Sequence, residues 1–164
     1  MRIVAGLLAL LAFAVCAASA RDKHPNPGDS NALQDCIKTS APAGKSTTEA
    51  ESCIGTLVNV CAPHRESMPS AAVITCIRRE SVVWDDILNE SFRRLRLKLD
   101  AAQQAGLRDM QRAWIASRDK TCAFYRDFYQ GSMANPMVAE CINRETGRRA
   151  LFLLGFALEA ENNR

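Results

Sequence analysis

Six cysteines downstream of residue 20 constrain the fold of this chain more than any other feature of its sequence. Residues 1–20 have the three regions of a secretory signal peptide, with Arg2, an apolar run over residues 3–15 and small residues at 18–20. An even number of cysteines in an exported chain predicts disulfides formed in an oxidising compartment. The cysteines are Cys36, Cys53, Cys61, Cys76, Cys122 and Cys141. We therefore expect three disulfides and a periplasmic or secreted protein.

An uncleaved membrane anchor is the alternative interpretation of the N-terminus. The apolar run is short for a bilayer span, which takes about 20 residues, so no transmembrane segment is expected after signal cleavage. A lipid-modified Cys16 is disfavoured because Val15 is larger than the small residue expected before such a cysteine. Cleavage leaves 164 less 20 residues, enough for one domain. We expect a mature start at Arg21, a flexible leader over 21–28 and a single domain over 29–164.

The pairing of the six cysteines is open in principle, with 15 combinations, but proximity narrows it. One pair flanks a predicted turn and would join the helices on either side, which leaves four cysteines in the N-terminal half. Each closed loop contributes about 2 to 4 kcal/mol, mostly by restricting the unfolded chain. The expected disulfides are Cys122 with Cys141, Cys53 with Cys61, and Cys36 with Cys76.

Apolar residues recur at three-, four- and seven-residue intervals over most of the chain, which is the spacing of amphipathic helices. A first long helix is expected over residues 70–101. A second contains Leu107 and stops at Gly131, a residue suited to the left-handed position after a helix. Asn135 and Pro136 supply a cap and a first-turn proline for a third helix, which ends near residue 161.

Two short helices are expected before the long ones. Asp29 or Ser30 can cap a helix that reaches Lys38. Ser46 and Glu49 have the spacing of a capping box ahead of a second short helix, which continues to about residue 59. No strand pattern of comparable length is present. The predicted fold is all-α, a small bundle of three long helices with a disulfide-tied N-terminal cap of short helices. Gly147 and Gly155 would allow a close helix approach or a bend in the third long helix.

Net charge gives little information about a partner. Signal cleavage removes one of the 21 basic residues against 18 acidic ones, too small an excess to predict binding to nucleic acid. A basic cluster of Arg93, Arg94, Arg96 and Lys98 is typical of a solvated helix face.

A mixed polar and aromatic stripe lies on the second long helix. Gln111, Trp114 and Arg118 fall at helical spacings, so an amide, an indole and a guanidinium share one side. One interpretation is a binding surface, to which the neighbouring Arg112 would add. The other is structural: Trp114 packs against Trp84 and Leu88 of the core, and Arg118 pairs with a carboxylate. The carboxylates considered for Arg118 are Asp85, Asp86 and Glu145.

The order and spacing of several motifs resemble one known family. The motifs are Trp84-Asp85-Asp86-Ile87-Leu88-Asn89-Glu90-Ser91-Phe92, then Leu107-Arg108, Gln111-Arg112-Ala113-Trp114-Ile115, Arg118-Asp119 and Cys122, followed by Cys141 and Arg148. On these motifs, over roughly residues 53–158, the chain resembles the LprI-type lysozyme inhibitors. The resemblance implies a small exported helical domain that binds and inhibits lysozyme, and so protects the bacterial cell wall. It implies neither catalysis nor a cofactor.

The chain departs from the family pattern at Phe92, where tyrosine is usual, and at Ser117, where an aromatic residue often stands. C-type lysozymes are strongly basic, so inhibition by a slightly basic chain requires a local acidic patch. The candidate carboxylates are Asp85, Asp86 and Glu90 on the first long helix, or Glu140, Glu145, Glu159 and Glu161 on the third. Ordinary helix-surface charge is the alternative for all of them. Loops at 62–70 or 131–135 could also enter a substrate cleft.

Other classes of function have weaker support in the sequence. An enzyme with a Ser-His or Cys-His nucleophile lacks parts, because the histidines are His24 in the leader and His64 in a loop. Cys61 and His64 have the spacing of half a zinc site, without a second half, so no metal is expected. An envelope-binding module is the alternative function, because a helical scaffold can keep its motif while its surface changes role. A lipid carrier is less favoured and rests on the apolar run 151–158.

Overall fold

The structure, a computed structural model, describes residues 26–42 and 45–163 and is helical throughout, with no strand in these ranges. The predicted signal peptide lies outside the described residues. The three predicted long helices are confirmed as α3 (Ser70–Arg96), α4 (Ala101–Tyr129) and α5 (Gly131–Asn162). The short elements before them are α1 (Pro27–Ser40), the 3-10 helix η1 (Thr47–Cys53), α2 (Thr56–Cys61) and the 3-10 helix η2 (Arg65–Ser67).

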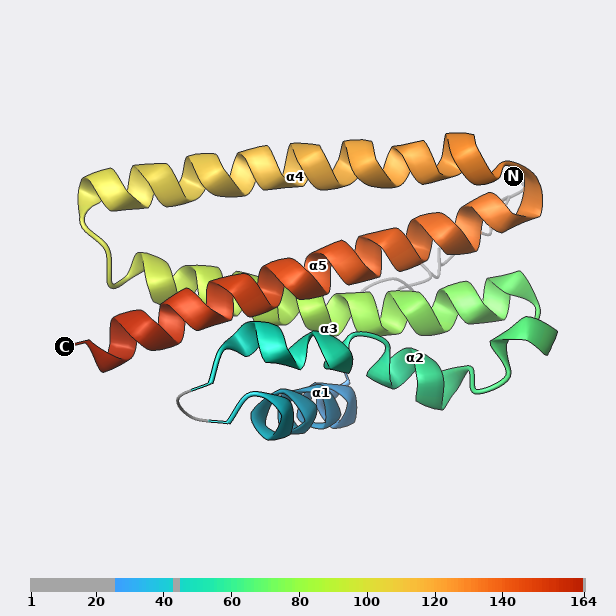
Figure 1. Ribbon diagram of the computed structural model, residues 1–164, viewed down its shortest axis with the longest axis horizontal. Helices are drawn as coiled ribbons and strands as arrows, with labels where there is room; N and C mark the ends of the chain where they lie inside the picture. The colour runs from blue at the N-terminus through green and yellow to red at the C-terminus, as the bar shows by residue number, and fades with distance from the viewer. Residues whose placement is uncertain (1–25, 43–44, 164) are drawn as a thin grey trace, which may run out of the picture.

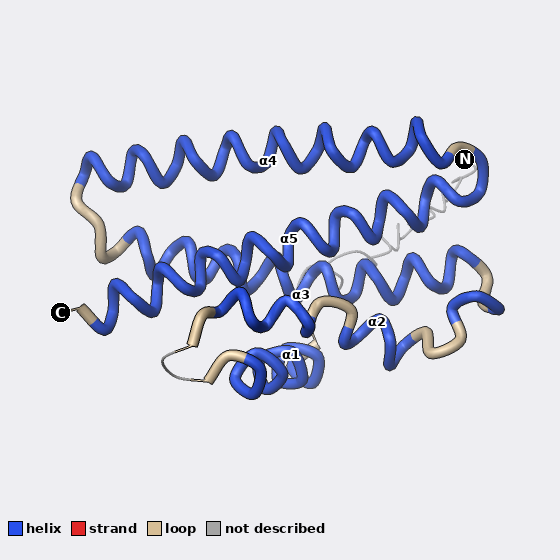
Figure 2. The backbone as a smooth tube through the Cα atoms, viewed as in Figure 1, coloured by secondary structure: helices blue, strands red, loops and turns tan. Residues whose placement is uncertain are grey.

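The helices form layers around the pair α3 and α5, which make the most extensive contact in the molecule. In Figure 1, α4 runs along one side of this pair, while α1, η1 and α2 lie on the opposite side. The tube in Figure 2 shows how little loop joins the long helices. None of the described helices is both long enough and apolar enough to cross a membrane.

The main core lies where α3 and α5 meet the N-terminal cap. Trp84 is fully buried there, together with Leu33 of α1 and Leu151 of α5. Gly147 makes this packing possible, because a Cβ at that position would lie 2.9 Å from Ile54 Cγ1 and 3.2 Å from Trp84 Cε2. At Gly155 a Cβ would lie 2.7 Å from the Thr47 hydroxyl. The predicted close approach at both glycines is therefore confirmed.

Three disulfides fasten the fold, and one of the three predicted pairs is confirmed. Cys122 of α4 is bonded to Cys141 of α5, as expected, whereas the two N-terminal pairs were wrong. The bonds observed there are Cys36–Cys53 and Cys61–Cys76.

The correction follows from a break in the predicted second short helix. Gly55 has a φ of 103°, a left-handed conformation that glycine adopts without a steric cost, and it separates η1 from α2. Cys53 ends η1, which packs against α1, and so it meets Cys36. Cys61 ends α2, which packs against α3, and so it meets Cys76.

Several helix ends also differ from the sequence prediction. Asn26 caps α1, whose first residue is Pro27, so this helix begins before Asp29. Ser46 does cap η1, but its hydroxyl accepts from the Thr48 amide, so the predicted box with Glu49 is not the one formed. A complete capping box occurs instead at the start of α4, between Asp100 and Gln103.

The turn from α4 to α5 is much tighter than predicted. Gln130 alone separates the two helices, with a φ of 47°, and Gly131 follows with a φ of 54°. Two successive left-handed residues reverse the chain at once. The third long helix therefore begins at Gly131 and not at Asn135, and Pro136 falls inside it.

Candidate functional site

An open groove of about 1630 Å³ runs between α3 and α4, with α5 as its floor. It exists because α4 packs against α5 and makes little contact with α3. Only Leu107 and Cys122 of α4 are buried. The apolar part of the lining is Ile74 and Val82 from α3, with Val138 and Ile142 from α5. Charged side chains from α3 and α4 complete the walls.

Arginines and aspartates face each other across this groove. Asp85 and Asp86 line it from α3, and Arg118 and Arg126 line it from α4. Asp85 accepts a hydrogen bond of 2.9 Å from the Asn89 amide. The side chains of Asp86 and Arg126 have no hydrogen bond or ion pair with any described residue. These two side chains are therefore available to a ligand or a partner protein.

A stack of an indole and two guanidinium groups joins α4 to α5. The carbon Cζ of Arg118 lies 5.0 Å from the Trp114 ring centroid, and Cζ of Arg149 lies 5.5 Å from it. The Arg149 guanidinium also covers the ring of Phe152 at 5.0 Å, and its Nε donates to Gln111 Oε1 at 2.9 Å. Gln111 and Trp114 thus hold an arginine that the sequence interpretation did not include.

Arg149 is the most unusual charge in the molecule. It is buried, and no carboxylate among the described residues forms an ion pair with it. Its Nη2 lacks a hydrogen-bond acceptor. Burial lowers the pKa of Arg149, because desolvation disfavours the charged form. The charge is stabilised by cation–π contacts with two rings and by the hydrogen bond to Gln111.

The predicted site residues fall into three groups. Asp85, Asp86 and Arg118 come together on the groove. Gln111 and Trp114 contact Arg149 at the α4–α5 seam, and Trp114 is half-buried against the core that contains Trp84 and Leu88, as the structural interpretation predicted.

The remaining predicted site residues form ion pairs with neighbours on their own helices. Glu90 accepts from Arg93, and Arg112 pairs with Asp109; neither lines the groove. The structure thus brings together one aspartate pair and one arginine from the predicted set, and leaves Glu90 and Arg112 outside.

The carboxylate partner predicted for Arg118 was wrong. Arg118 donates to its neighbour Asp119, with Nη2 2.9 Å from Oδ1. Asp85 and Asp86 lie on the opposite wall of the groove. Glu145 pairs instead with Arg144 and Arg148 on its own helix. The prediction therefore gave Arg118 an ion-pair partner on another helix, whereas the carboxylate it contacts is on its own helix.

The third-helix carboxylates do not form an acidic patch either. Glu140 pairs with Arg65, and Glu161 accepts two hydrogen bonds from Arg94. The hydrogen bond from Arg94 lowers the pKa of Glu161. Arginines pair in this way with 8 of the 17 acidic side chains of the described residues.

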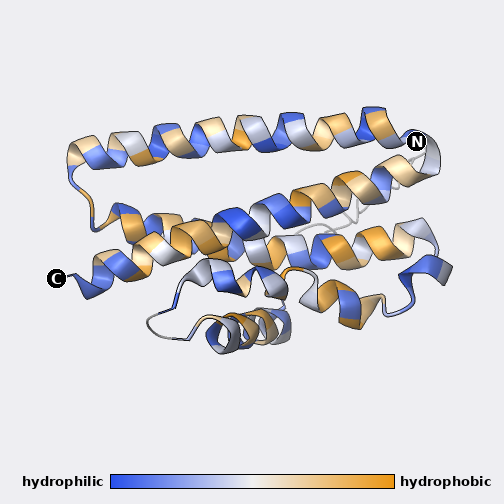
Figure 3. Ribbon diagram, viewed as in Figure 1, coloured by the Kyte–Doolittle hydropathy of each residue, from blue (hydrophilic) through white to orange (hydrophobic). Residues whose placement is uncertain are grey.

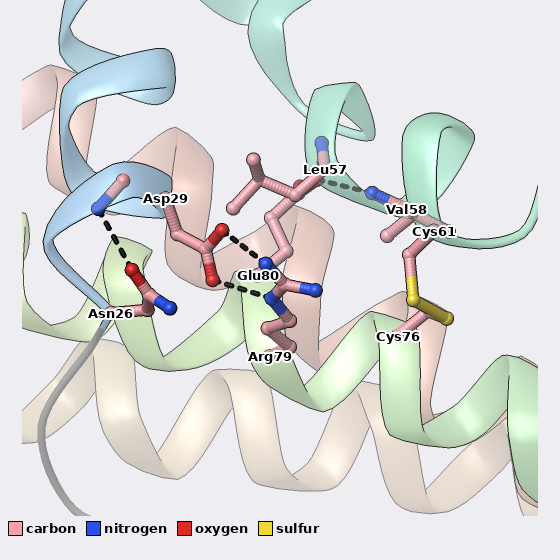
Figure 4. A network of polar contacts seen from close by, with 9 residues as sticks. Asn26, Asp29, Leu57, Val58, Cys61, Cys76, Arg79 and Glu80 are labelled. Carbon is pink, nitrogen blue, oxygen red and sulfur yellow. Dashed lines mark hydrogen bonds and ion pairs between the residues drawn. A yellow bond between two sulfur atoms is a disulfide. The ribbon is translucent and has the colours of Figure 1, made fainter.

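Glu80 is the residue that the sequence interpretation missed. It is fully buried, and its carboxylate accepts from the backbone amides of Gly55, Leu57 and Val58 at 2.7 to 3.1 Å. It also accepts from Trp84 Nε1 at 3.1 Å and from the Asn143 amide at 2.8 Å. Glu80 thus caps α2 from another helix (Figure 4). The sequence signal was a charged residue one turn before Trp84, in the stripe that faces the core.

A second polar contact in Figure 4 ties α1 to α3. The exposed Arg79 donates two hydrogen bonds to the buried Asp29. These bonds raise the pKa of Arg79. Within the described ranges, no group of three or more His, Cys, Asp and Glu side chains is arranged to hold a metal ion.

The three disulfides and the helical layers define a class, a small all-α domain of an extracytoplasmic protein. Comparison with protein families refines this class. The model of the family described as Lysozyme inhibitor LprI matches residues 61–153, more than half of the chain. The chain therefore belongs to the LprI lysozyme inhibitor family. No curated protein and no solved structure matches it.

The matched residues cover η2, α3, α4 and most of α5, with two of the three disulfides. They include both walls of the groove and the arginine–tryptophan stack. Phe92, where the family usually has tyrosine, is half-buried and packs against the main core. Ser117, the other departure, is exposed on α4.

Proposed function

We propose that this protein is an exported inhibitor that binds lysozyme, without catalysing a reaction, and so protects the bacterial cell wall. The observation that carries the proposal is membership of the LprI family over the residues that build the groove. Three disulfides support export to the periplasm or beyond the cell, and the predicted signal peptide would direct it there.

We further propose that the groove is part of the surface that contacts lysozyme. Asp86 and Arg126 are charged, line the groove and have no partner among the described residues. A partner protein can supply the opposite charges, and such complementary charges increase the association rate and fix the orientation of a complex. Asp85 and Arg118 would add contacts from the two walls. Trp114 and Gln111 would act indirectly, by holding α4 against α5.

A lysis assay tests the proposal. Purified, oxidised mature protein is added in increasing amounts to C-type, G-type and phage-type lysozymes acting on cell-wall suspensions. Dose-dependent inhibition of at least one class is expected, and protein that has been reduced and alkylated is the control. The proposal would be contradicted if the rate of lysis by each of the three classes were the same with the protein, at every concentration, as without it.

An envelope-binding module is the second candidate, and two arginines favour it. Arg78 and Arg126 line the groove and have no described partner. Unpaired guanidinium groups bind phosphate and carboxylate groups, which anionic envelope polymers carry. Sedimentation with washed cell walls, in the absence of lysozyme, tests this candidate. Retention in the wall pellet that salt abolishes is the result it predicts.

The lipid-carrier alternative gains no support from residues 151–158. Leu151, Leu153 and Ala157 are fully buried in the core, while Phe152 and Phe156 point outward. The run therefore divides between packing and surface, and none of its residues lines the groove.

A further inference from the structure

The groove between α3 and α4 contains unpaired charges of both signs. Arg78 and Arg126 line it, one from each wall, and neither side chain has a hydrogen bond or ion pair with a described residue. The Asp86 side chain is also without such a partner, and Asp85 beside it accepts one hydrogen bond, from Asn89. All four charged residues are exposed. Two cations and two anions are therefore available to a ligand in the groove.

Arg126 lies towards the end of the groove where α5 begins. In Figure 1, α3 and α5 run in the same direction and α4 runs against them. The Cys122–Cys141 disulfide fixes the level of α4 beside α5. Arg126 comes about one turn after Cys122. Because α4 and α5 are antiparallel, Arg126 is level with the turn of α5 that precedes Cys141.

The arginine and the aspartates of α3 lie on opposite sides of one contact with α5. This contact is the hydrogen bond of 3.0 Å that the Ser81 hydroxyl donates to Asn143. Arg78 comes about one turn before Ser81, towards the start of α5 and the arginine of α4. Asp85 and Asp86 come about one turn after Ser81, towards the other end. At a rise of about 1.5 Å per residue, Arg78 and the aspartates are about 10 to 12 Å apart along α3. The groove thus has a basic end and an acidic end.

The surface along these charges is apolar and partly accessible. Ile74 and Val82 of α3 and Val138 of α5 are half-buried, and Ile142 of α5 is 38% exposed. A ligand that covers such side chains removes apolar surface from water, which favours binding. Small ligands are usually held in this way, by apolar contacts along the site and a few charged groups that fix the orientation.

We propose that the groove binds the short peptide stems of the bacterial cell wall, with a stem carboxylate on Arg78 and Arg126 and a stem amine on Asp85 and Asp86. This inference rests on the second candidate function, wall binding, and names its ligand; it concerns the protein without lysozyme. An extended peptide rises about 3.3 Å per residue, so about three or four residues span the two charged ends. Wall stems are peptides of this length, rich in alanine. They carry free carboxylates and, in walls that contain diaminopimelate, a free amine.

The two signs of charge favour a zwitterion over a uniformly charged ligand. A polyanion would be attracted by the two arginines and repelled by Asp85 and Asp86, and a polycation would meet the reverse. A zwitterionic peptide pairs with both ends at once. A guanidinium group binds a carboxylate through two parallel hydrogen bonds, and an ionised aspartate accepts from an ammonium group. The aspartates therefore narrow the envelope ligand to one that carries an amine as well as a carboxylate.

Titration calorimetry with a defined peptide tests the inference. The probe is the stem peptide that an amidase releases from washed walls of the diaminopimelate type. Wild-type protein should bind it. The same peptide with its amine acetylated, or with its carboxylates amidated, should bind at least tenfold more weakly, because each modification removes the charge that one end of the groove recognises.

Paired variants locate the site. Arg78→Gln/Arg126→Gln should bind the peptide at least tenfold more weakly than wild type. The matched control is Arg108→Gln/Arg112→Gln, which makes the same change of charge on exposed residues outside the groove and should stay within twofold. Melting temperatures should be unchanged in both, because the replaced side chains are exposed.

The orientation of the peptide gives a second readout. Acetylation of the amine should weaken binding to wild type and make no further difference to Asp85→Asn/Asp86→Asn, since the partner of the amine is already gone. Amidation should in the same way make no further difference to Arg78→Gln/Arg126→Gln. Effects of a modification and a variant that multiply would mean that the two groups do not meet.

The failure of this inference can be told from the failure of wall binding. A wild type that is retained by washed walls and is not displaced by excess stem peptide would overturn the inference and leave the wall-binding candidate standing. Equal affinity for the native and the modified peptides would also overturn the inference alone. A wild type that neither binds the peptide nor is retained by walls would remove the candidate and the inference together.

Discussion

Glu80 shows how one side chain can fix the relation of three helices. Its carboxylate accepts from the start of α2, from Trp84 on its own helix and from Asn143 on α5. An ionised carboxylate is stable in the core only because every acceptor position is used in this way. Removal of the carboxylate would leave several buried donors without a partner.

We therefore predict that Glu80→Ala destabilises the protein by about 3 kcal/mol or more, since each orphaned buried donor costs about 1 to 3 kcal/mol. Urea unfolding followed by circular dichroism measures this loss. Glu90→Gln, on the exposed side of the same helix, is the control and should change stability by less than about 0.5 kcal/mol. Similar midpoints for the two variants would contradict the role given to Glu80.

The close packing around Gly147 allows a second prediction for a single residue. Gly147→Ala places a Cβ within 3 Å of Ile54, so the core must shift, at about 1 to 3 kcal/mol. Gly106→Ala is the matched control, because nothing lies within 4 Å of a Cβ there. Alanine favours the helix over glycine, so this control should stabilise by up to about 1 kcal/mol. Thermal unfolding should show shifts of opposite sign, and shifts of one sign would contradict the packing.

The sequence predicts the contacts of a side chain better when its partners are near in the chain than when they are distant. Trp114 against the core followed from helical periodicity. Glu80, by contrast, accepts hydrogen bonds from residues up to 63 positions away, and the local sequence around it does not indicate these partners. Arg118 was assigned to distant carboxylates although Asp119 is its neighbour. Spacing shows which side chains share a face, and the choice among several possible partners depends on the fold.

At the scale of elements, α4 is the least secured of the long helices. It buries only Leu107 and Cys122, and Figure 3 shows polar and apolar residues mixed along its length. The Cys122–Cys141 disulfide attaches the C-terminal part of α4 to α5. A helix with so little buried surface should depend on that bond.

We predict that Cys122→Ser/Cys141→Ser loses about 3 kcal/mol of stability and, before global unfolding, frees the C-terminal half of α4. Hydrogen exchange followed by mass spectrometry should show faster exchange over residues 115–129. Exchange in α3 should stay slow, which provides the internal control. Unchanged protection of α4 would mean that packing alone holds it.

The pair formed by Arg94 and Glu161 links the ends of α3 and α5 and predicts a dependence on pH. The hydrogen bond from Arg94 lowers the pKa of Glu161 in the folded protein. Its contribution is therefore present above the carboxyl pKa of the unfolded chain, about 4.3, and is lost as the pH falls through the lowered folded value. Urea unfolding should show Glu161→Gln less stable than wild type at pH 7, with the difference shrinking at pH 3. A constant difference would contradict the linkage.

Element boundaries followed the sequence where a repeated pattern defined them. The periodic apolar residues predicted all three long helices. The short helices were harder to predict, because the left-handed Gly55 divides a segment whose sequence pattern is that of one helix. That division moved Cys53 and Cys61 onto different elements and made the predicted pairing wrong. The one-residue turn at Gln130 was equally hidden, because glutamine rarely adopts a positive φ.

The whole molecule consists of a well-packed core region and one long helix, α4, that is much less buried. The pair α3 and α5, with the N-terminal cap, holds nearly all of the core, and α4 forms one wall of the groove. The family match covers α4, α3 and most of α5. The proposed role, lysozyme binding, rests on this family match and requires a complex of defined composition.

Sedimentation velocity on mature, oxidised protein mixed with an equal amount of lysozyme tests this account most directly. We predict one faster species that contains one copy of each protein. Two species that sediment independently, with each lysozyme class at micromolar concentration, would contradict the account.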